Sequence, residues 1–363
     1  MKIISFFLYP IALIYGMINF FRNKCYDWGI FKKTAFGFPV IAVGNLSMGG
    51  SGKTPHVEYL VRLLKNNFNL ATLSRGYGRS SKGFIIATTK SHSREIGDEP
   101  VQFKQKFQDI VVAVDENRVH GIKQIKNKYP KTEIVILDDA FQHRAVKPGL
   151  NILLTDFHNL YPEDYLFPSG RLREFRIGAK RADIIIVTKT PTILSPITIR
   201  RIQGLIKPRP YQKLYFSYIK YGPITLMPGS KAPETPDKFN TVLLFAGIAN
   251  IYPLEEHVRG LTNHLEILPF SDHHDYTNKD FDKIRERFED IYTRNKIIIT
   301  TEKDAMRLCL PEVPEFISDL PIYYIPIEIK IHRDFRKDFN DQIINYVTEN
   351  TANSRFYTKP DSN

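Results

Sequence analysis

The sequence predicts an α/β protein in which a mostly parallel sheet carries helices on both faces. Short runs of Val, Ile and Leu alternate with polar, helix-like stretches along most of the chain. These runs are apolar throughout, as expected for strands buried on both faces. A Gly-rich turn follows the first run, and strand–helix–strand rhythm of this kind favours parallel pairing. The predicted class is therefore a P-loop NTPase type of α/β fold.

The first half of the chain contains six apolar runs, each about the length of one strand. They are 38–43, 69–73, 109–114, 133–137, 151–155 and 183–187. Periodic segments between the runs predict helices over 54–66, 99–107 and 116–128. We therefore expect residues 31–206 to form one core domain.

The second half begins with a Pro-rich stretch over 207–240, which predicts a linker or an extended ribbon. A second α/β rhythm follows and predicts a smaller C-terminal lobe over 241–350. Its expected strands are 241–248, 296–301 and 322–329, and its expected helices are 253–261, 278–294 and 334–350. The polar residues 351–363 are expected to be a frayed tail.

Composition narrows the class of protein. The chain has 363 residues, and its 51 Lys and Arg against 39 Asp and Glu give a formal charge of +12. Such a charge favours anionic partners, namely nucleic acid, phosphorylated metabolites or an anionic membrane. The only cysteines are Cys25 and Cys309, which excludes a four-cysteine zinc site and a disulfide framework.

The N-terminal segment carries no charge from Ile3 to Phe21, with Lys2 before it and Arg22 after it. As a helix it would reach ~28 Å, just short of a bilayer core of ~30 Å. We expect residues 1–30 to form a membrane-associated helix, spanning or interfacial. A buried core helix and a cleaved signal peptide are the alternatives, although no small-residue cleavage pattern follows.

A strand ending in a Gly-rich turn predicts a phosphate site at VIAVGNLSMGGSGKTP, residues 40–55. Glycines let backbone N–H groups turn toward phosphate oxygens, and the following helix N-terminus adds its positive end. Lys53 would meet the β- and γ-phosphates, and the Thr54 hydroxyl would bind Mg²⁺. The predicted nucleotide-binding residues are Gly49, Gly50, Ser51, Gly52, Lys53 and Thr54.

The loop departs from the usual GxxxxGK[ST] pattern, because Ser47 stands where the first Gly is expected. A nucleotide site of this kind also needs a carboxylate for Mg²⁺ at the end of a hydrophobic strand. EIVILDDAFQHR supplies one, because its apolar run ends at Asp138 and Asp139. Two adjacent carboxylates repel each other without a cation. We expect the pair to serve Mg²⁺.

A GTPase would read guanine through an N/T-K-x-D motif after a strand. Here Thr188 and Lys189 fit, but Pro191 replaces the Asp. The departure weakens guanine specificity.

Eight strings in order resemble one family. They are AVGNLSMGGSGKTP, SRGYGR, GDEP, LDDAFQHR, PSGRLRE, FAGIANIYP, FSDHHDY and TEKDAMR. Together they are similar to tetraacyldisaccharide 4′-kinases of lipid A biosynthesis, over roughly residues 1–330. In FAGIANIYP the Pro falls later than the family pattern leads us to expect, which affects local geometry only.

The resemblance implies transfer of a phosphoryl group from MgATP to the 4′-hydroxyl of a tetraacylated glucosamine disaccharide 1-phosphate, giving a lipid IVA-type product. It implies a P-loop core, a smaller lobe on a ribbon-like linker and an N-terminal membrane helix. By motif, Asp98 is the general base and His273 its partner. Their positions in different lobes would require the lobes to close.

Three further residues are expected at substrate or phosphate. Arg75 and Arg171 suit phosphate because a guanidinium binds it bidentately, and a surface salt bridge is the alternative for each. Gln142 continues the LDDAFQHR motif, and Glu174 is expected to pair with Arg75 or Arg171.

The implied partners are a lipid substrate and a membrane surface, at the cytoplasmic face of the inner membrane of a Gram-negative-type bacterium. We infer no nucleic-acid partner and no obligate protein partner. The alternative is a membrane-associated nucleotide-dependent switch or assembly factor. A kinase for a soluble small molecule is the third possibility, and it leaves the apolar N-terminus without a purpose.

Overall fold

The computed structural model describes residues 8–230, 239–248, 250–272, 274–293, 295–308 and 319–357. Contacts divide the chain into two compact units. Unit 1 runs to Lys90, resumes over Phe103–Ile219 and resumes again from Ile329, and unit 2 consists of Ser91–Gln102 and Lys220–Glu328. The division departs from the expected ranges in three places. Residues 207–219, expected in the linker, belong with unit 1 and contribute to the strand Lys213–Tyr221. The segment Ser91–Gln102 belongs with the second unit, and the last helix belongs with the first.

A nine-stranded sheet forms the centre of unit 1, in the order β14-β8-β7-β6-β1-β5-β2-β4-β3. Its strands are β1 (Val40–Asn45), β2 (Leu70–Ser74), β3 (Ile85–Ile86), β4 (Val111–Val114), β5 (Ile134–Leu137), β6 (Leu150–Asp156), β7 (Ile184–Thr188), β8 (Lys213–Tyr221) and β14 (Ile327–Ile331). Neighbours from β4 to β8 pair in parallel, and β3 is antiparallel to its neighbour β4. The α/β class and the six strands expected before residue 190 are confirmed.

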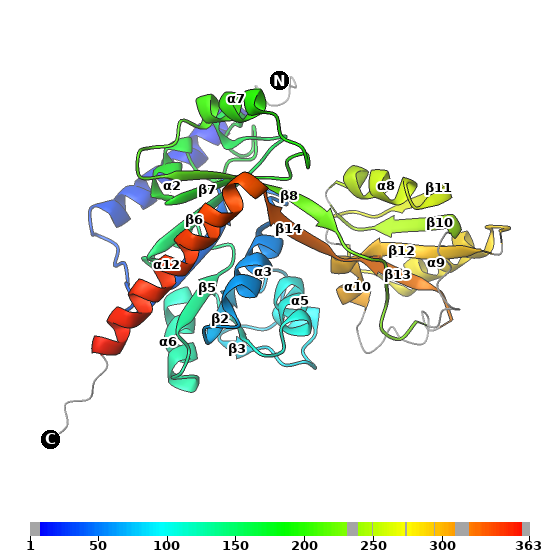
Figure 1. Cartoon of the computed structure of the whole chain (residues 1–363), viewed down its shortest axis with the longest axis horizontal. Coiled ribbons are helices and arrows are strands. Elements are labelled where there is room, and N and C mark those ends of the chain that lie inside the picture. The colour runs from blue at the N-terminus through cyan, green and yellow to red at the C-terminus, as the bar shows by residue number, and fades with distance from the viewer. Residues whose placement is uncertain are drawn as a thin grey trace. The chain divides into compact units, whose positions relative to one another are not determined.

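Helices cover the sheet of unit 1 (Figure 1). They are α2 (Tyr9–Asp27), α3 (Lys53–Leu64), α6 (Arg118–Lys128), α7 (Pro196–Ile206), α12 (Arg333–Tyr357) and the 3₁₀ turns η1 (Tyr161–Glu163) and η2 (Arg176–Arg181). Helix α12 was expected in the C-terminal lobe. Its buried Phe339, Ile343 and Val347 recur at helical spacing, and Tyr215 of β8 donates a hydrogen bond to Asp338 at 2.7 Å.

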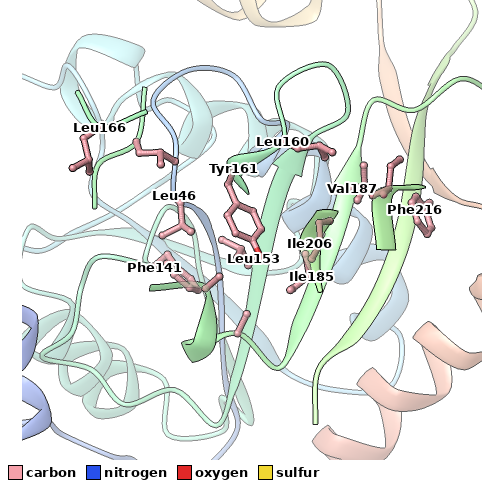
Figure 2. Close-up of a cluster of buried hydrophobic side chains, with 14 of the residues drawn as sticks. Leu46, Phe141, Leu153, Leu160, Tyr161, Leu166, Ile185, Val187, Ile206 and Phe216 are labelled. Carbon is pink, nitrogen blue, oxygen red and sulfur yellow. The ribbon is translucent and has the colours of Figure 1, made fainter. Parts of the chain in front are cut away.

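One buried cluster lies directly behind the Gly-rich turn (Figure 2). Leu46, the first residue after β1, and Phe141 of the LDDAFQHR motif both belong to it. Gly44 allows this packing, because a Cβ there would lie 2.7 Å from the backbone nitrogen of Phe141. The phosphate motif and the acidic motif are therefore fixed to the same core.

Helix α2 packs on unit 1 through one face only. Ala12 and Gly16 are buried, and a Cβ on Gly16 would lie 2.5 Å from Leu166 Cδ1. The opposite stripe of Ile11, Ile14 and Ile18 is exposed. Within the described residues, which begin at residue 8, no helix is long and apolar enough to cross a membrane.

Unit 2 is built on a five-stranded sheet in the order β11-β10-β12-β13-β9. Its elements are α4 (Ser93–Ile96), the first half of α5 (Asp98–Lys106), β9 (Thr225–Leu226), β10 (Phe239–Ala246), α8 (Tyr252–Arg259), β11 (Thr262–Pro269), α9 (Asn278–Glu289), β12 (Lys296–Thr301), α10 (Glu302–Leu308) and β13 (Ile322–Ile325). Strand β11 escaped the sequence analysis because it is an edge strand with a mixed pattern, TNHLEILP, and no continuous apolar run.

Candidate active site

The predicted phosphate-binding residues occupy the turn between β1 and α3. Strand β1 ends at Asn45 and helix α3 begins at Lys53. Gly49 and Gly52 have φ angles of 100° and 80°, a left-handed conformation that favours glycine. Gly52 stands at the N-cap without a side-chain cap, so the first N–H groups of α3 remain for a ligand.

Lys53 lies beside the acidic motif. Its Nζ is 3.4 Å from Asn45 Oδ1 and 3.7 Å from Asp139 Oδ1. Asp139 also accepts hydrogen bonds from Arg173 at 3.3 Å. Burial alone would raise the pKa of Asp139, but Lys53 and Arg173 outweigh it and hold that pKa below its usual range. Asp139 is therefore an anion held between two cations.

Asp138 is buried beside Asp139 and has a buried arginine behind it. Arg118, 2% exposed, donates from Nη2 to the Asp138 carbonyl at 3.4 Å. Burial lowers the pKa of Arg118 to about 10, although the charges of Asp138 and Asp139 act in the opposite direction. The guanidinium stays protonated at neutral pH and offsets part of the charge of the acidic pair.

The PSGRLRE loop supports the Gly-rich turn from one side. Met48 N donates to Arg171 O at 2.7 Å, and Arg173 N donates to Leu46 O at 2.8 Å. The side chain of Arg171 is directed elsewhere, since its Nε lies 3.4 Å from Asp164 Oδ2. Arg173, which the sequence analysis missed, is the arginine of this loop that faces the acidic pair.

Gln142 links the two motifs. Its Nε2 donates to Asn45 O at 2.8 Å and to Glu174 Oε1 at 3.3 Å. Glu174 is buried and accepts two hydrogen bonds from Arg181, at 2.7 and 2.9 Å. The expected pairing of Glu174 with Arg75 or Arg171 is wrong, because its arginine partner is Arg181. Gln142 thus positions the turn through the backbone of Asn45.

Arg75 is exposed at the end of β2. It lies near enough to His143 for its charge to lower the pKa of that histidine, which burial and Arg118 also lower, to about 4. Arg75 therefore adds positive charge on the same side of unit 1 as Arg118.

Buried polar contacts hold the turn from behind. His56 Nδ1 lies 2.7 Å from Gly52 O, and its Nε2 lies 2.9 Å from Ser217 Oγ of β8. Burial lowers the pKa of His56 to about 4, so the ring is neutral. Thr188 at the end of β7, which would precede a guanine-binding lysine in a GTPase, donates a hydrogen bond to Ser51 O at 3.0 Å. The end of β7 serves here to fix the turn.

The donor set fits a nucleotide with a hard divalent cation. Ser51 Oγ is buried and has no hydrogen-bond partner within the described part of the chain. The Thr54 hydroxyl and the Asp138 and Asp139 carboxylates are oxygen ligands of the kind Mg²⁺ prefers. Within the described ranges, no group of three His, Cys, Asp or Glu side chains gathers as a cage for a metal. A Mg²⁺ held by one or two carboxylates and substrate phosphates needs no such cage.

The second predicted group lies in unit 2. Asp98 begins helix α5 and accepts hydrogen bonds at its Oδ2 from Arg307 Nε and Nη2, at 2.8 and 2.6 Å. His273, its expected partner, lies outside the described residues. The next residue, His274, is described and lies 3.1 Å from Asp280 Oδ2.

Four side chains of these sites were missed from sequence: Asn45, Arg118, Arg173 and Arg307. Three of them stand inside strings already singled out, AVGNLSMGGSGKTP, PSGRLRE and TEKDAMR. Arg118 belongs to none of those strings, and its position after the polar turn that follows β4 was its only signal.

Comparison with known proteins gives a consistent result. The profile of the family described as LpxK, tetraacyldisaccharide-1-P 4′-kinase, matches residues 4–345. A tetraacyldisaccharide 4′-kinase of Bacteroides thetaiotaomicron is 48% identical over 361 residues, covering 96% of this chain and 95% of the relative. One of Flavobacterium johnsoniae is 43% identical over 350 residues, covering 96% and 99%.

A solved structure agrees with the sequence relatives. The crystal structure of LpxK from Aquifex aeolicus in complex with ATP superposes with a TM-score of 0.72. The two chains are 28% identical, and the match covers 95% of this chain and 100% of the LpxK chain. On the family match across most of the chain, the relatives above 40% identity and the shared fold, the chain belongs to the tetraacyldisaccharide-1-P 4′-kinase family.

Proposed function

We propose that the protein is a phosphotransferase of lipid A biosynthesis. It transfers the γ-phosphoryl group of ATP to the 4′-hydroxyl of a tetraacylated glucosamine disaccharide 1-phosphate. The observation that carries the proposal is the position of Lys53. It is the first residue of α3, directly after a turn whose glycines have left-handed φ angles, and its Nζ lies beside Asp139. That arrangement suits a nucleotide triphosphate, and the family supplies the acceptor.

The residues of unit 1 have distinct roles in this proposal. The N–H groups at the turn and Lys53 bind the phosphates and draw negative charge toward them. Thr54, Asp138 and Asp139 would hold Mg²⁺, which neutralises charge on the phosphates when bound. Arg173 and Gln142 keep Asp139 and Asn45 in place. Arg75 is proposed to contact phosphate from the exposed side, and Arg171 is assigned no contact with phosphate because it pairs with Asp164.

Asp98 is proposed as the general base. As the oxygen of the 4′-hydroxyl forms its bond to phosphorus, its proton passes to the Asp98 carboxylate and the bond from phosphorus to ADP breaks. His273 is proposed as the partner of Asp98. The motif GDEP and the Arg307 contacts that hold its carboxylate support the assignment of Asp98.

We further propose that the protein acts at the cytoplasmic face of the inner membrane. The support is the exposed stripe on α2, where Ile11, Ile14, Ile18 and Phe21 are each at least 55% exposed. Cationic Arg22 follows it directly. An apolar helical stripe next to basic residues suits a lipid interface with anionic headgroups.

The transfer reaction is tested with labelled ATP and a detergent-solubilised tetraacyl disaccharide 1-phosphate. Wild type should yield a labelled lipid whose new phosphate is at the 4′ position by mass spectrometry. Lys53→Ala should lose at least about 10²-fold in rate, in the range seen when a charged transition-state contact is removed. Lys123→Ala, an exposed lysine on α6 of the same unit, is the matched control and should keep the wild-type rate. An unlabelled lipid with wild-type protein would contradict the proposal.

Membrane association is tested by flotation with vesicles containing anionic lipid. The double variant Ile14→Glu and Ile18→Glu should stay with the soluble fraction, because each charge would enter the apolar layer. Tyr252→Glu, at a 76% exposed position in unit 2, should float like wild type. Equal flotation of the double variant and wild type would contradict the role assigned to α2.

A further inference from the structure

Helix α10 holds the start of helix α5 inside unit 2. Its sequence, EKDAMRL, contains all but the first residue of the TEKDAMR string. Three side chains of α10 reach the first turn of α5 and the residues next to it. The pairs are Lys303 with Glu99 at 3.4 Å, Gln102 with Glu302 at 3.5 Å, and Arg307 with Asp98 at 2.6 and 2.8 Å.

The Arg307 contact differs from the other two in geometry and burial. Both Nε and Nη2 donate to one oxygen, Asp98 Oδ2. The side chains are 7% and 17% exposed, so water competes little for either group. Two hydrogen bonds from a planar guanidinium to one carboxylate oxygen hold that oxygen in one place.

Arg307 is itself fixed by a second carboxylate. Its Nη1 donates to Asp304 Oδ1 at 3.1 Å, and Asp304 is fully buried. Asp304 in turn accepts hydrogen bonds from Gly247 N at 3.0 Å and Thr301 Oγ1 at 2.7 Å. Burial would lower the pKa of Arg307, but Asp98 and Asp304 raise it above its usual value. The guanidinium is thus a permanent cation with a fixed direction.

The same contacts bring together strings that are far apart in the sequence. Gly247 belongs to FAGIANIYP, and a Cβ there would lie 3.1 Å from Asp304 Oδ1 and 3.1 Å from Ser271 O of FSDHHDY. A Cβ at this position would therefore crowd the Asp304 carboxylate. The strings GDEP, FAGIANIYP, FSDHHDY and TEKDAMR therefore meet around one pair of side chains, Arg307 and Asp304.

We propose that Arg307, directed by Asp304, is the positioning residue that holds the Asp98 carboxylate in its proton-accepting orientation. The inference rests on the proposed role of Asp98 as base. In the transfer step the hydroxyl proton goes to Asp98, and Arg307 forms and breaks no covalent bond. The Arg307 guanidinium donates hydrogen bonds to both Asp304 and Asp98. Asp304 therefore fixes the guanidinium, and the guanidinium in turn holds Asp98.

The test compares Arg307→Gln, Arg307→Lys, Asp98→Asn and the double variant Asp98→Asn with Arg307→Gln. Arg307→Gln should lower kcat by roughly 10²-fold, the size of effect expected from a reacting group misplaced by about 1 Å. KM for ATP should stay within about twofold of wild type, because the nucleotide contacts are in unit 1. Arg259→Gln is the matched control, an exposed arginine of unit 2 paired with Glu255 four residues away, and it should match wild type.

Arg307→Lys keeps the charge that buried Asp304 needs, but an ammonium is a point donor without the planar fork. It should fold like wild type in a thermal melt and recover part, not all, of the kcat lost in Arg307→Gln. This variant carries the test if Arg307→Gln proves unfolded. A lysine variant with wild-type kcat would overturn the positioning role.

The double variant separates positioning from general structural support. If Arg307 acts through Asp98, adding Arg307→Gln to Asp98→Asn should lower kcat by less than about twofold further. Losses that multiply in full would overturn the inference. The two proposals fail differently: wild-type kcat in Asp98→Asn would refute the base, whereas an inactive Asp98→Asn beside a fully active Arg307→Gln would refute only the positioning role.

Discussion

The buried histidine behind the glycine turn makes a pH-dependent prediction. His56 joins Gly52 O to Ser217 Oγ, and burial lowers its pKa from 6.5 to about 4. The folded state therefore binds this proton less readily than the unfolded state. The stabilisation is complete above pH 6.5 and is lost as the pH falls from 6.5 toward 4. At 1.36 kcal/mol per unit, the loss between pH 7.5 and pH 5 is roughly 2 kcal/mol.

His56→Gln removes this titration and weakens the two hydrogen bonds. At pH 7.5 the variant should be less stable than wild type by roughly 1–3 kcal/mol, the cost of disturbing buried hydrogen bonds. At pH 5 the gap between the two proteins should shrink by about 2 kcal/mol. Only wild type has a His56 that takes up a proton on unfolding, and this uptake favours its unfolded state at low pH.

The assay is urea unfolding followed by circular dichroism, on both proteins at both pH values. His143, whose pKa burial also lowers to about 4, is present in both proteins and cancels in the difference. A gap in the free energy of unfolding that is the same at pH 7.5 and pH 5 would refute the buried, neutral state of His56.

Two further predictions concern the acidic motif and its packing. Arg173→Gln should lower kcat/KM for ATP by roughly 10-fold, because Asp139 loses a partly exposed charged partner worth about 1.5 kcal/mol, and a transfer assay at varied ATP measures it. An unchanged kcat/KM would mean that Asp139 does not depend on Arg173. Gly44→Ala should lower the free energy of unfolding by roughly 1–3 kcal/mol, because the new Cβ would lie 2.7 Å from Phe141 N. A melting temperature equal to that of wild type would contradict this close approach.

Much of unit 1 could be predicted because its signals are local. A buried parallel strand is a continuous apolar run, and the six runs before residue 190 all became strands within two residues of the expected ends. The glycine turn and the Asp138–Asp139 pair were likewise found at strand ends, where parallel sheets place their ligand sites.

The remainder depended on contacts between distant segments. Helix α12 has a clear apolar face, but that face alone does not indicate whether the helix packs on β8 or on the sheet of unit 2. The segment Ser91–Gln102 joins unit 2 through ion pairs with α10, about 200 residues later, as between Asp98 and Arg307. Arg171 and Arg173 are two residues apart, and only the pairing of this loop with the glycine turn decides which one faces Asp139.

The central claim is that this chain uses its glycine turn for phosphoryl transfer to a lipid acceptor and not for a nucleotide-driven switch. The most direct measurement is the release of ADP, with and without the tetraacyl disaccharide 1-phosphate, set against the phosphorylated lipid formed. We predict one lipid phosphorylated for each ADP released, and a rate without acceptor lower by at least about 10²-fold, since the bond to phosphorus needs the oriented hydroxyl. Steady ADP release that is independent of the acceptor, with no phosphorylated lipid, would contradict the account.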